Sequence, residues 1–138
     1  MKKSLKLLTM MVATIAFLTI NMAMIQKPGG PWDIPAKYKA MKSPLKANDA
    51  SINSVGKELY NKHCKSCHGS KGLGDGPKAA KLETDCGDFS SKEFQALSDG
   101  ELYYMSIIGR DEMPNFEKKI PDELDRWAVV EYLRTMKK

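Results

Sequence analysis

Histidine and cysteine are scarce in this chain of 138 residues, which holds two histidines and three cysteines. The sequence shows no pairing of a nucleophile with a base, no glycine-rich loop of the kind that binds phosphate, and no internal repeat. These absences argue against an enzyme that uses nucleophilic catalysis and against a nucleotide-binding protein. The chemistry of the chain is therefore concentrated in its few histidines and cysteines.

Positive charge is concentrated in the N-terminal part of the chain. Residues 1–50 hold eight lysines against two aspartates, a net charge of +6, whereas residues 51–138 hold fourteen basic and fifteen acidic residues, a net charge of −1. The overall charge of +5 therefore does not describe a basic folded domain. We predict that nucleic acid is not a partner.

The N-terminus has the pattern of an export signal. Lys2, Lys3 and Lys6 precede an apolar run over residues 7–25, as in the positive and hydrophobic regions of a secretory leader. The run is also close to the length of a membrane-spanning helix, and its small-residue cleavage site is poorly formed. We predict that residues 1–25 are either a cleaved signal peptide or an N-terminal anchor. Both place the rest of the chain in the periplasm, on the extracytoplasmic face of the inner membrane.

Residues 26–50 are rich in proline and include a glycine pair. This composition predicts an extended linker without helix that acts as a stiff spacer. The segment also carries apolar side chains that are costly to expose to water, namely Trp32, Ile34, Tyr38 and Met41. A second interpretation is therefore that the segment packs on the following domain or docks on a partner.

Residues 51–138 are predicted to form one mostly helical domain. Apolar residues at helical spacing predict a first helix over residues 51–63. Capping-box patterns that begin at Ser90 and at Ser98 predict two short helices. Gly109 is predicted to end the second of these, because glycine tolerates a left-handed backbone.

A final helix is predicted to open at Pro121 and to end with the lysines at the end of the chain. Proline is favoured in a first turn, and basic residues in a last turn complement the helix dipole. The predicted buried face of this helix recurs every four residues and comprises Leu124, Ala128, Tyr132 and Met136.

Cys64, Cys67 and His68 form the most informative motif of the chain. Two cysteines at this spacing also occur in zinc sites and thiol redox sites, but a histidine directly after them is typical of c-type haem attachment. On a short helical turn the two thiols face the same way, so each can bond one vinyl group while the imidazole binds iron. Cys86 is left over. We predict a shielded thiol there, with a disulfide to another chain or a redox-sensing role as alternatives.

The second axial ligand of the iron is predicted to be a methionine. The other histidine, His63, directly precedes the attachment motif and cannot reach the opposite side of the haem. Outside the leader and linker, the methionines of the chain are Met105, Met113 and Met136. Met113 is followed by Pro114, which favours an extended backbone in a loop free to approach iron. We therefore predict Met113 as the distal ligand, with Met105 as the next candidate.

As a whole, the pattern resembles the class I monohaem c-type cytochromes. The resemblance covers about residues 51–138 and is carried by the attachment motif and by residues 56–60, 72–77, 113–114 and 127–134. It implies an all-α cytochrome c fold, in which short helices wrap around one covalently bound haem c. It also implies a distal ligand from the Met-Pro loop before the last helix, in agreement with Met113.

Two further contacts are implied by the resemblance alone. The first and last helices are expected to cross closely, with Gly56 and Tyr60 on the first helix facing Val129, Tyr132 and Leu133 on the last. The proximal imidazole of His68 is expected to donate a hydrogen bond to the backbone carbonyl of Pro77.

Candidate partners for the haem propionates are polar side chains near the predicted ligand loop. Arg110 precedes that loop and is a candidate ion-pair partner, although a surface role is the common one for an arginine. Further candidates for hydrogen bonds to a propionate are Tyr103, Tyr104 and Trp127.

With both axial positions of the iron filled, the sequence predicts an electron carrier and not an enzyme. The expected partners are membrane-bound or extracytoplasmic redox proteins. One alternative is a haem subunit that brings electrons into a larger oxidoreductase complex. Another is a peroxidase or gas-binding protein, which requires an open iron position, and a third is a metal or thiol site without haem.

Overall fold

The structure is a computed structural model that describes residues 30–138. The predicted signal peptide or anchor over residues 1–25, and the first four residues of the predicted linker, lie outside the described residues. The helical elements of the described part are α2 (Ala36–Lys39), α3 (Ala50–His63), α4 (Lys65–His68), the 3₁₀ helix η1 (Ala79–Lys81), α5 (Lys92–Gln95), α6 (Asp99–Tyr103), the π-helix η2 (Tyr104–Ile108) and α7 (Glu123–Arg134). Over residues 30–138 no helix is long and apolar enough to cross a membrane, and no β-strand forms.

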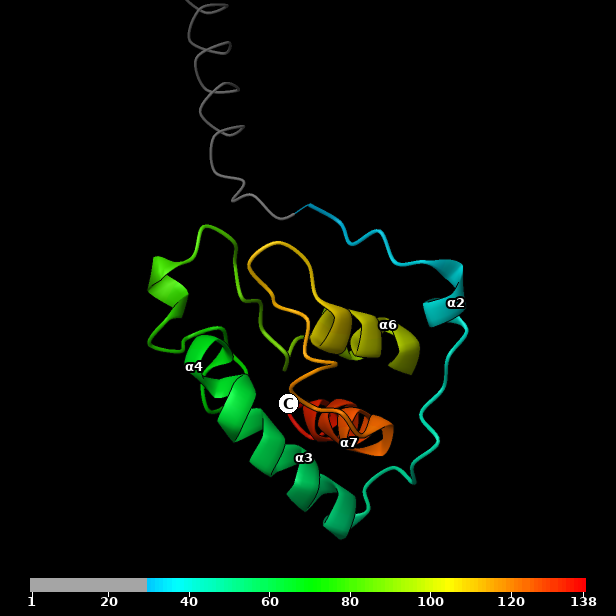
Figure 1. Ribbon diagram of the computed structural model, residues 1–138. Helices are drawn as coiled ribbons and strands as arrows, with labels where there is room; N and C mark the ends of the chain where they lie inside the picture. Colours follow the sequence, from blue (N-terminus) through cyan, green and yellow to red (C-terminus); the bar gives the residue numbers. More distant parts are fainter. Residues whose placement is uncertain (1–29) are drawn as a thin grey trace, which may run out of the picture.

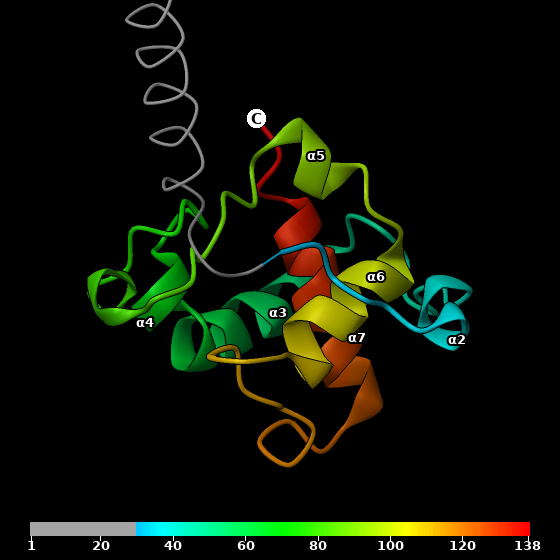
Figure 2. The same cartoon turned by 90° about the horizontal axis from the view of Figure 1, so that it is seen from above.

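Helices α3 and α7 cross at close range, as both views of the molecule show (Figures 1 and 2). Gly56 lies at the crossing, where a Cβ atom would overlap the carbonyl oxygen of Ala128 and lie 2.8 Å from Cβ of Tyr132. The rings of Tyr60 and Tyr132 pack with centroids 5.4 Å apart. The predicted crossing at Gly56 is therefore present, although Ala128 and not Val129 faces the glycine.

Aspartate side chains cap the N-terminal ends of the two long helices. The side chain of Asp49 accepts hydrogen bonds from the backbone of Ser51 and Ile52, which begins α3 one residue before the predicted start. Asp122 caps α7 in the same way, so this helix opens two residues after Pro121. It ends at Arg134, before the terminal lysines. Because a capping carboxylate satisfies backbone N–H groups that proline cannot, Asp122 and not the proline sets the start.

The predicted buried face of α7 is wrong at Leu124, whose side chain is 56% exposed. A strict four-residue spacing drifts around a helix of 3.6 residues per turn, so its first and last members do not share a face. The side chains that α7 buries are Trp127, Ala128, Val129, Val130, Glu131 and Leu133.

Two hydrophobic clusters meet at α7. One contains Tyr60, Phe89, Phe116, Ile120, Val129 and Leu133. The other contains Leu102, Tyr103, Ile107, Trp127 and Val130. Because adjacent faces of α7 supply both clusters, this helix joins α3 to the layer formed by α6 and η2.

The short helices between Ser90 and Gly109 follow the predicted order with one shift. The side chain of Ser91 caps α5, whereas Ser90 donates a hydrogen bond to Asp88 instead. The capping box at Ser98 is confirmed, with both of its hydrogen bonds present. Gly109 ends η2 with a φ angle of 71°, as predicted for a residue with a left-handed backbone.

The segment from residue 30 to residue 49 packs on the domain. The expectation of an extended stretch without helix is wrong at α2. The second interpretation, that the segment packs on the following domain, is the one that the structure shows for residues 30–49. Gly100 of α6 contacts the backbone of Tyr38 so closely that a Cβ atom would overlap the Tyr38 carbonyl oxygen. The rings of Tyr38 and Tyr104 lie 4.7 Å apart. Apolar side chains of the segment thereby leave water, which stabilises its packing on the domain.

Candidate cofactor site

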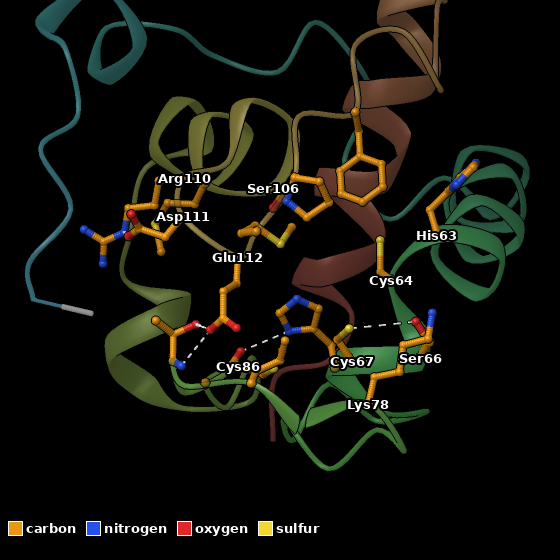
Figure 3. A pocket seen from close by; sticks show the side chains of 18 of the residues that line it. His63, Cys64, Ser66, Cys67, Lys78, Cys86, Ser106, Arg110, Asp111 and Glu112 are labelled. Atoms are coloured by element: carbon orange, nitrogen blue, oxygen red, sulfur yellow. Dashed lines mark hydrogen bonds and ion pairs between the residues drawn. The ribbon is translucent and has the colours of Figure 1, made fainter. Parts of the chain in front are cut away.

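A cavity of about 510 Å³ lies between the end of α3, α4 and the loop that follows η2. Figure 3 shows side chains of its lining around this space, with Cys67, Cys86 and Glu112 near its centre and Arg110 directed away from it. The residues of the attachment motif line it together with Met113. Its apolar lining includes Leu82, Phe89, Phe94, Met105 and Phe116. The volume is within the range of about 300–1,000 Å³ for cavities that bind cofactors or other small molecules.

The attachment motif is placed on one tight turn because α4 follows α3 directly. The backbone N–H groups of Cys67 and His68 both donate to the carbonyl of Cys64, at 3.1 and 3.0 Å. Gly69 ends this turn with a φ angle of 79°, and its carbonyl accepts a hydrogen bond from the hydroxyl of Tyr60 at 2.7 Å. The two thiols and the imidazole therefore all line the same cavity.

Cys64 and Cys67 are free thiols in the structure. Burial, with a smaller contribution from Cys67, raises the pKa of the Cys64 thiol to about 12. Before haem attachment, the Cys64 thiol is therefore protonated at physiological pH. Two half-buried, unlinked thiols at the edge of an apolar cavity fit the requirement for two thioether bonds to a haem.

The imidazole of His68 is held from two sides. Its Nδ1 lies 3.0 Å from the backbone carbonyl oxygen of Cys86, and its ring stacks on Phe89 with centroids 4.5 Å apart. Burial lowers the pKa of His68, although the hydrogen bond to Cys86 offsets part of this shift. The imidazole is therefore neutral at physiological pH, which is the form that ligates a metal.

The predicted acceptor for this imidazole, the carbonyl of Pro77, is not the one in the structure. The backbone beside Pro77 is hydrogen bonded to the attachment turn, since Gly76 N donates to Cys67 O at 3.0 Å and Lys78 N to Ser66 O at 2.9 Å. Pro77 itself is exposed, and the carbonyl that the imidazole meets is that of Cys86 in the following loop.

Met113 lies on the loop that closes the other side of the cavity. Its backbone N–H donates to the carbonyl of Arg110 at 2.8 Å, and a Cβ atom on Gly109 would overlap the Met113 carbonyl oxygen. Met105, on the π-helix η2, lines the same cavity. Met136 instead packs beside Gly72 and Phe89 in the core. The structure therefore leaves Met113 and Met105 as candidates for the distal position.

Arg110 lines the cavity, but its guanidinium is already engaged. It donates hydrogen bonds to the carbonyls of Gly30 and Pro31 and lies 3.7 Å from Asp111. The other predicted propionate partners lie in aromatic contacts away from the cavity lining: Tyr103, Tyr104 and Trp127. The hydroxyl of Tyr103, for example, accepts a hydrogen bond from Arg126 at 3.0 Å, because the helix that carries it packs on α7.

His63 also lines the cavity, with its ring 5.8 Å from that of Phe116. Burial is the main cause that lowers the pKa of His63, and Lys62 and Lys119 add to the shift. Its Nε2 is buried without a hydrogen-bond partner. His63 therefore packs directly beside the attachment turn.

Several residues of the site were missed from the sequence. Phe89 carries no motif, and only its place in an apolar cluster reveals that it stacks on the imidazole. The sequence shows that Trp32 is an apolar side chain that is costly to expose, but no residue near it indicates that it lines the cavity. The carboxylate of Glu112, which binds Thr84 across 28 residues of sequence, also had none.

Comparison with known proteins decides among the interpretations of this site. A family model described as Cytochrome c matches residues 54–137. The chain belongs to the cytochrome c family. The all-α cytochrome c fold is thereby confirmed, and with the attachment motif so is the cofactor, one covalently bound haem c with its iron. The interpretation as a metal or thiol site without haem is excluded.

A solved structure extends the comparison. One chain of a reducing HAO-like protein complex from Kuenenia stuttgartiensis is 27% identical, with a TM-score of 0.59, over 69% of this cytochrome and 47% of that chain. The cytochrome thus spans about half the length of that relative. A search of curated proteins finds no match. Family and neighbour together support electron transfer by haem as the general role.

Proposed function

We propose that this cytochrome is an electron carrier whose iron has His68 and Met113 as its axial ligands. Cys64 and Cys67 would hold the haem through thioether bonds. The observation that carries the proposal is the placement of His68 and Met113 in the lining of one cavity, on different segments of the chain. When bound, the haem would supply a one-electron redox centre, whose iron would accept an electron from a donor protein and pass it to an acceptor protein.

The protein's own residues determine the environment that the haem iron would have. The Cys86 carbonyl orients the imidazole of His68 through Nδ1, so Nε2 would be the nitrogen available to ligate the iron. Phe89, Phe94 and Phe116 line the cavity with apolar surface, which disfavours water beside a bound haem. A thioether ligand and an apolar surrounding both favour the reduced metal, so we expect a higher potential than bis-histidine ligation gives.

The proposed partners are redox proteins outside the cytoplasm. The export pattern of residues 1–25 supports a periplasmic location, either diffusing or held at the inner membrane through residues 7–25. A domain with a net charge of −1 over residues 51–138 supports a protein partner over nucleic acid. With both axial positions filled, the iron itself would have no open position for a substrate.

A second candidate is a haem subunit that brings electrons into a larger oxidoreductase. The likeness to one chain of an HAO-like protein complex favours it. Purification of the full-length protein in mild detergent distinguishes the two candidates. A carrier elutes alone, whereas a subunit elutes with a large partner in fixed proportion.

The axial ligand is tested by replacing each candidate methionine in the full-length, haem-loaded protein. Met113→Ala is expected to lose the weak sulfur-ligation absorption band of the oxidised form, to lower the reduction potential and to bind carbon monoxide when reduced. Met105→Ala is the matched control, because its thioether lines the same cavity, and it is expected to keep the band. Loss of the band in Met105→Ala alone would transfer the ligand role to Met105. Strong carbon monoxide binding by the unmutated protein would favour the gas-binding or peroxidase alternative.

A further inference from the structure

The described N-terminal residues contact the loop that carries Met113. Arg110 donates hydrogen bonds to two successive carbonyls, those of Gly30 at 2.6 Å and Pro31 at 3.0 Å. Its guanidinium also lies 4.2 Å from the centroid of the Trp32 ring. In Figure 3 the Arg110 side chain points toward the chain segment that leads to residue 30. We call this set of contacts the Trp32–Arg110 clamp.

Trp32 is held in place by contacts with the layer formed by α6 and η2. Its ring meets Tyr104 edge to face, with centroids 6.3 Å apart, and Tyr104 in turn packs on Tyr38 of α2 at 4.7 Å. Two residues after Trp32, the side chain of Ile34 is 6% exposed. The segment therefore holds Arg110 against a surface that is itself packed on the core.

Arg110 is at the base of the loop that carries Met113. The Arg110 carbonyl accepts the Met113 N–H at 2.8 Å, which closes a tight turn between the two residues. Trp32 and Arg110 line the cofactor cavity together with Met113. A displacement of Arg110 therefore moves the backbone that carries the methionine, and it opens the cavity at the same place.

We propose that the Trp32–Arg110 clamp positions the distal ligand loop, so that residues outside the family-matched range of 54–137 determine how firmly Met113 is held. Trp32 and Arg110 are positioning residues, acting through the backbone of the loop. The inference deepens the proposed function and rests on Met113 as the ligand. Its consequence is that a competing ligand for iron must first displace a loop that the clamp restrains.

The test measures competition by imidazole in the full-length, haem-loaded, oxidised protein. Trp32→Ala and Arg110→Ala are each expected to bind imidazole about tenfold more tightly than the unmutated protein, because a partly buried cation–π contact is lost. Faster deuterium exchange at the Met113 amide is expected in both variants, and the double variant should add little to either. Arg110→Lys keeps the charge but lacks the planar fork that binds two carbonyls, so it should also bind imidazole more tightly.

Lys37→Ala is the matched control for the clamp. It removes a cation–π contact from the same N-terminal segment, since the Lys37 ammonium lies 4.9 Å from the Tyr38 ring. This contact is not part of the cavity lining, so imidazole affinity should stay unchanged. If Trp32→Ala does not accumulate, Arg110→Lys decides the question.

Two results separate failure of this inference from failure of the proposed function. Absence of the sulfur-ligation band in the unmutated protein would overturn Met113 ligation and the clamp's role with it. A normal band, with imidazole affinities of the clamp variants within about twofold of Lys37→Ala, would overturn the clamp alone.

Discussion

Glu112 accepts two hydrogen bonds from Thr84, one from the backbone N–H at 2.8 Å and one from the hydroxyl at 2.7 Å. Thr84 is two residues before Cys86, whose carbonyl binds the imidazole of His68. Glu112 directly precedes Met113 in the sequence. One carboxylate therefore joins the loops that serve the two sides of the cofactor cavity (Figure 3).

We expect the Glu112–Thr84 contact to make stability depend on pH. The two hydrogen bonds lower the pKa of Glu112 below its ordinary value. Because the folded-state pKa is the lower one, the stabilisation is complete above the ordinary carboxyl pKa of about 4.3 and is lost as pH falls through the folded-state pKa. Glu112→Gln should thus have a lower urea midpoint than the unmutated protein at neutral pH, and the difference should shrink in acid.

The control is Glu58→Gln, which alters an exposed carboxylate on α3. Its urea midpoint at neutral pH should match that of the unmutated protein. A difference between Glu112→Gln and the unmutated protein that stays constant with pH would contradict a role for the charged carboxylate.

Gly56→Ala is expected to destabilise the fold. The added methyl group would overlap the carbonyl oxygen of Ala128, which belongs to the backbone of α7 and cannot rotate away. Overpacking of this kind costs about 1–3 kcal/mol, and it outweighs the gain of up to about 1 kcal/mol in helix propensity from glycine to alanine. Chemical denaturation of the haem-loaded protein measures the difference in the free energy of unfolding.

Ser54→Ala provides the comparison for Gly56→Ala because Ser54 is an exposed position of the same helix. Alanine there should be neutral or slightly stabilising. Equal stability of the two variants would show that α3 and α7 separate at little cost, contrary to the close crossing.

Features fixed by neighbouring residues were predictable from the sequence. The capping box at Ser98 and the left-handed Gly109 each depend on a few adjacent residues, and both are present. The turn that places Cys64, Cys67 and His68 together is also local. The cofactor could therefore be inferred from these three residues and their spacing in the sequence. Residues near in sequence constrain one another whatever the remainder of the chain does.

Contacts between distant segments could not be predicted in the same way. The Cys86 carbonyl replaces that of Pro77 because two loops meet, and a backbone carbonyl carries no residue signature. Trp32 and Arg110 are separated by most of the described chain, so neither indicates the other. The predicted buried face of α7 was wrong at Leu124, because a four-residue spacing drifts around the helix and away from the contact with α3.

The last prediction concerns the third cysteine, Cys86, whose contribution to His68 comes from its backbone. Cys86→Ala keeps that carbonyl, so the haem should stay attached through denaturing electrophoresis and the visible spectrum should be unchanged. Cys64→Ala and Cys67→Ala serve as the comparison, because each is expected to lose one thioether bond and to shift the spectrum of the reduced protein. Mass spectrometry of the three matured variants checks attachment. Loss of covalent haem from Cys86→Ala would mean that the thiol, and not only the carbonyl, takes part in holding the cofactor.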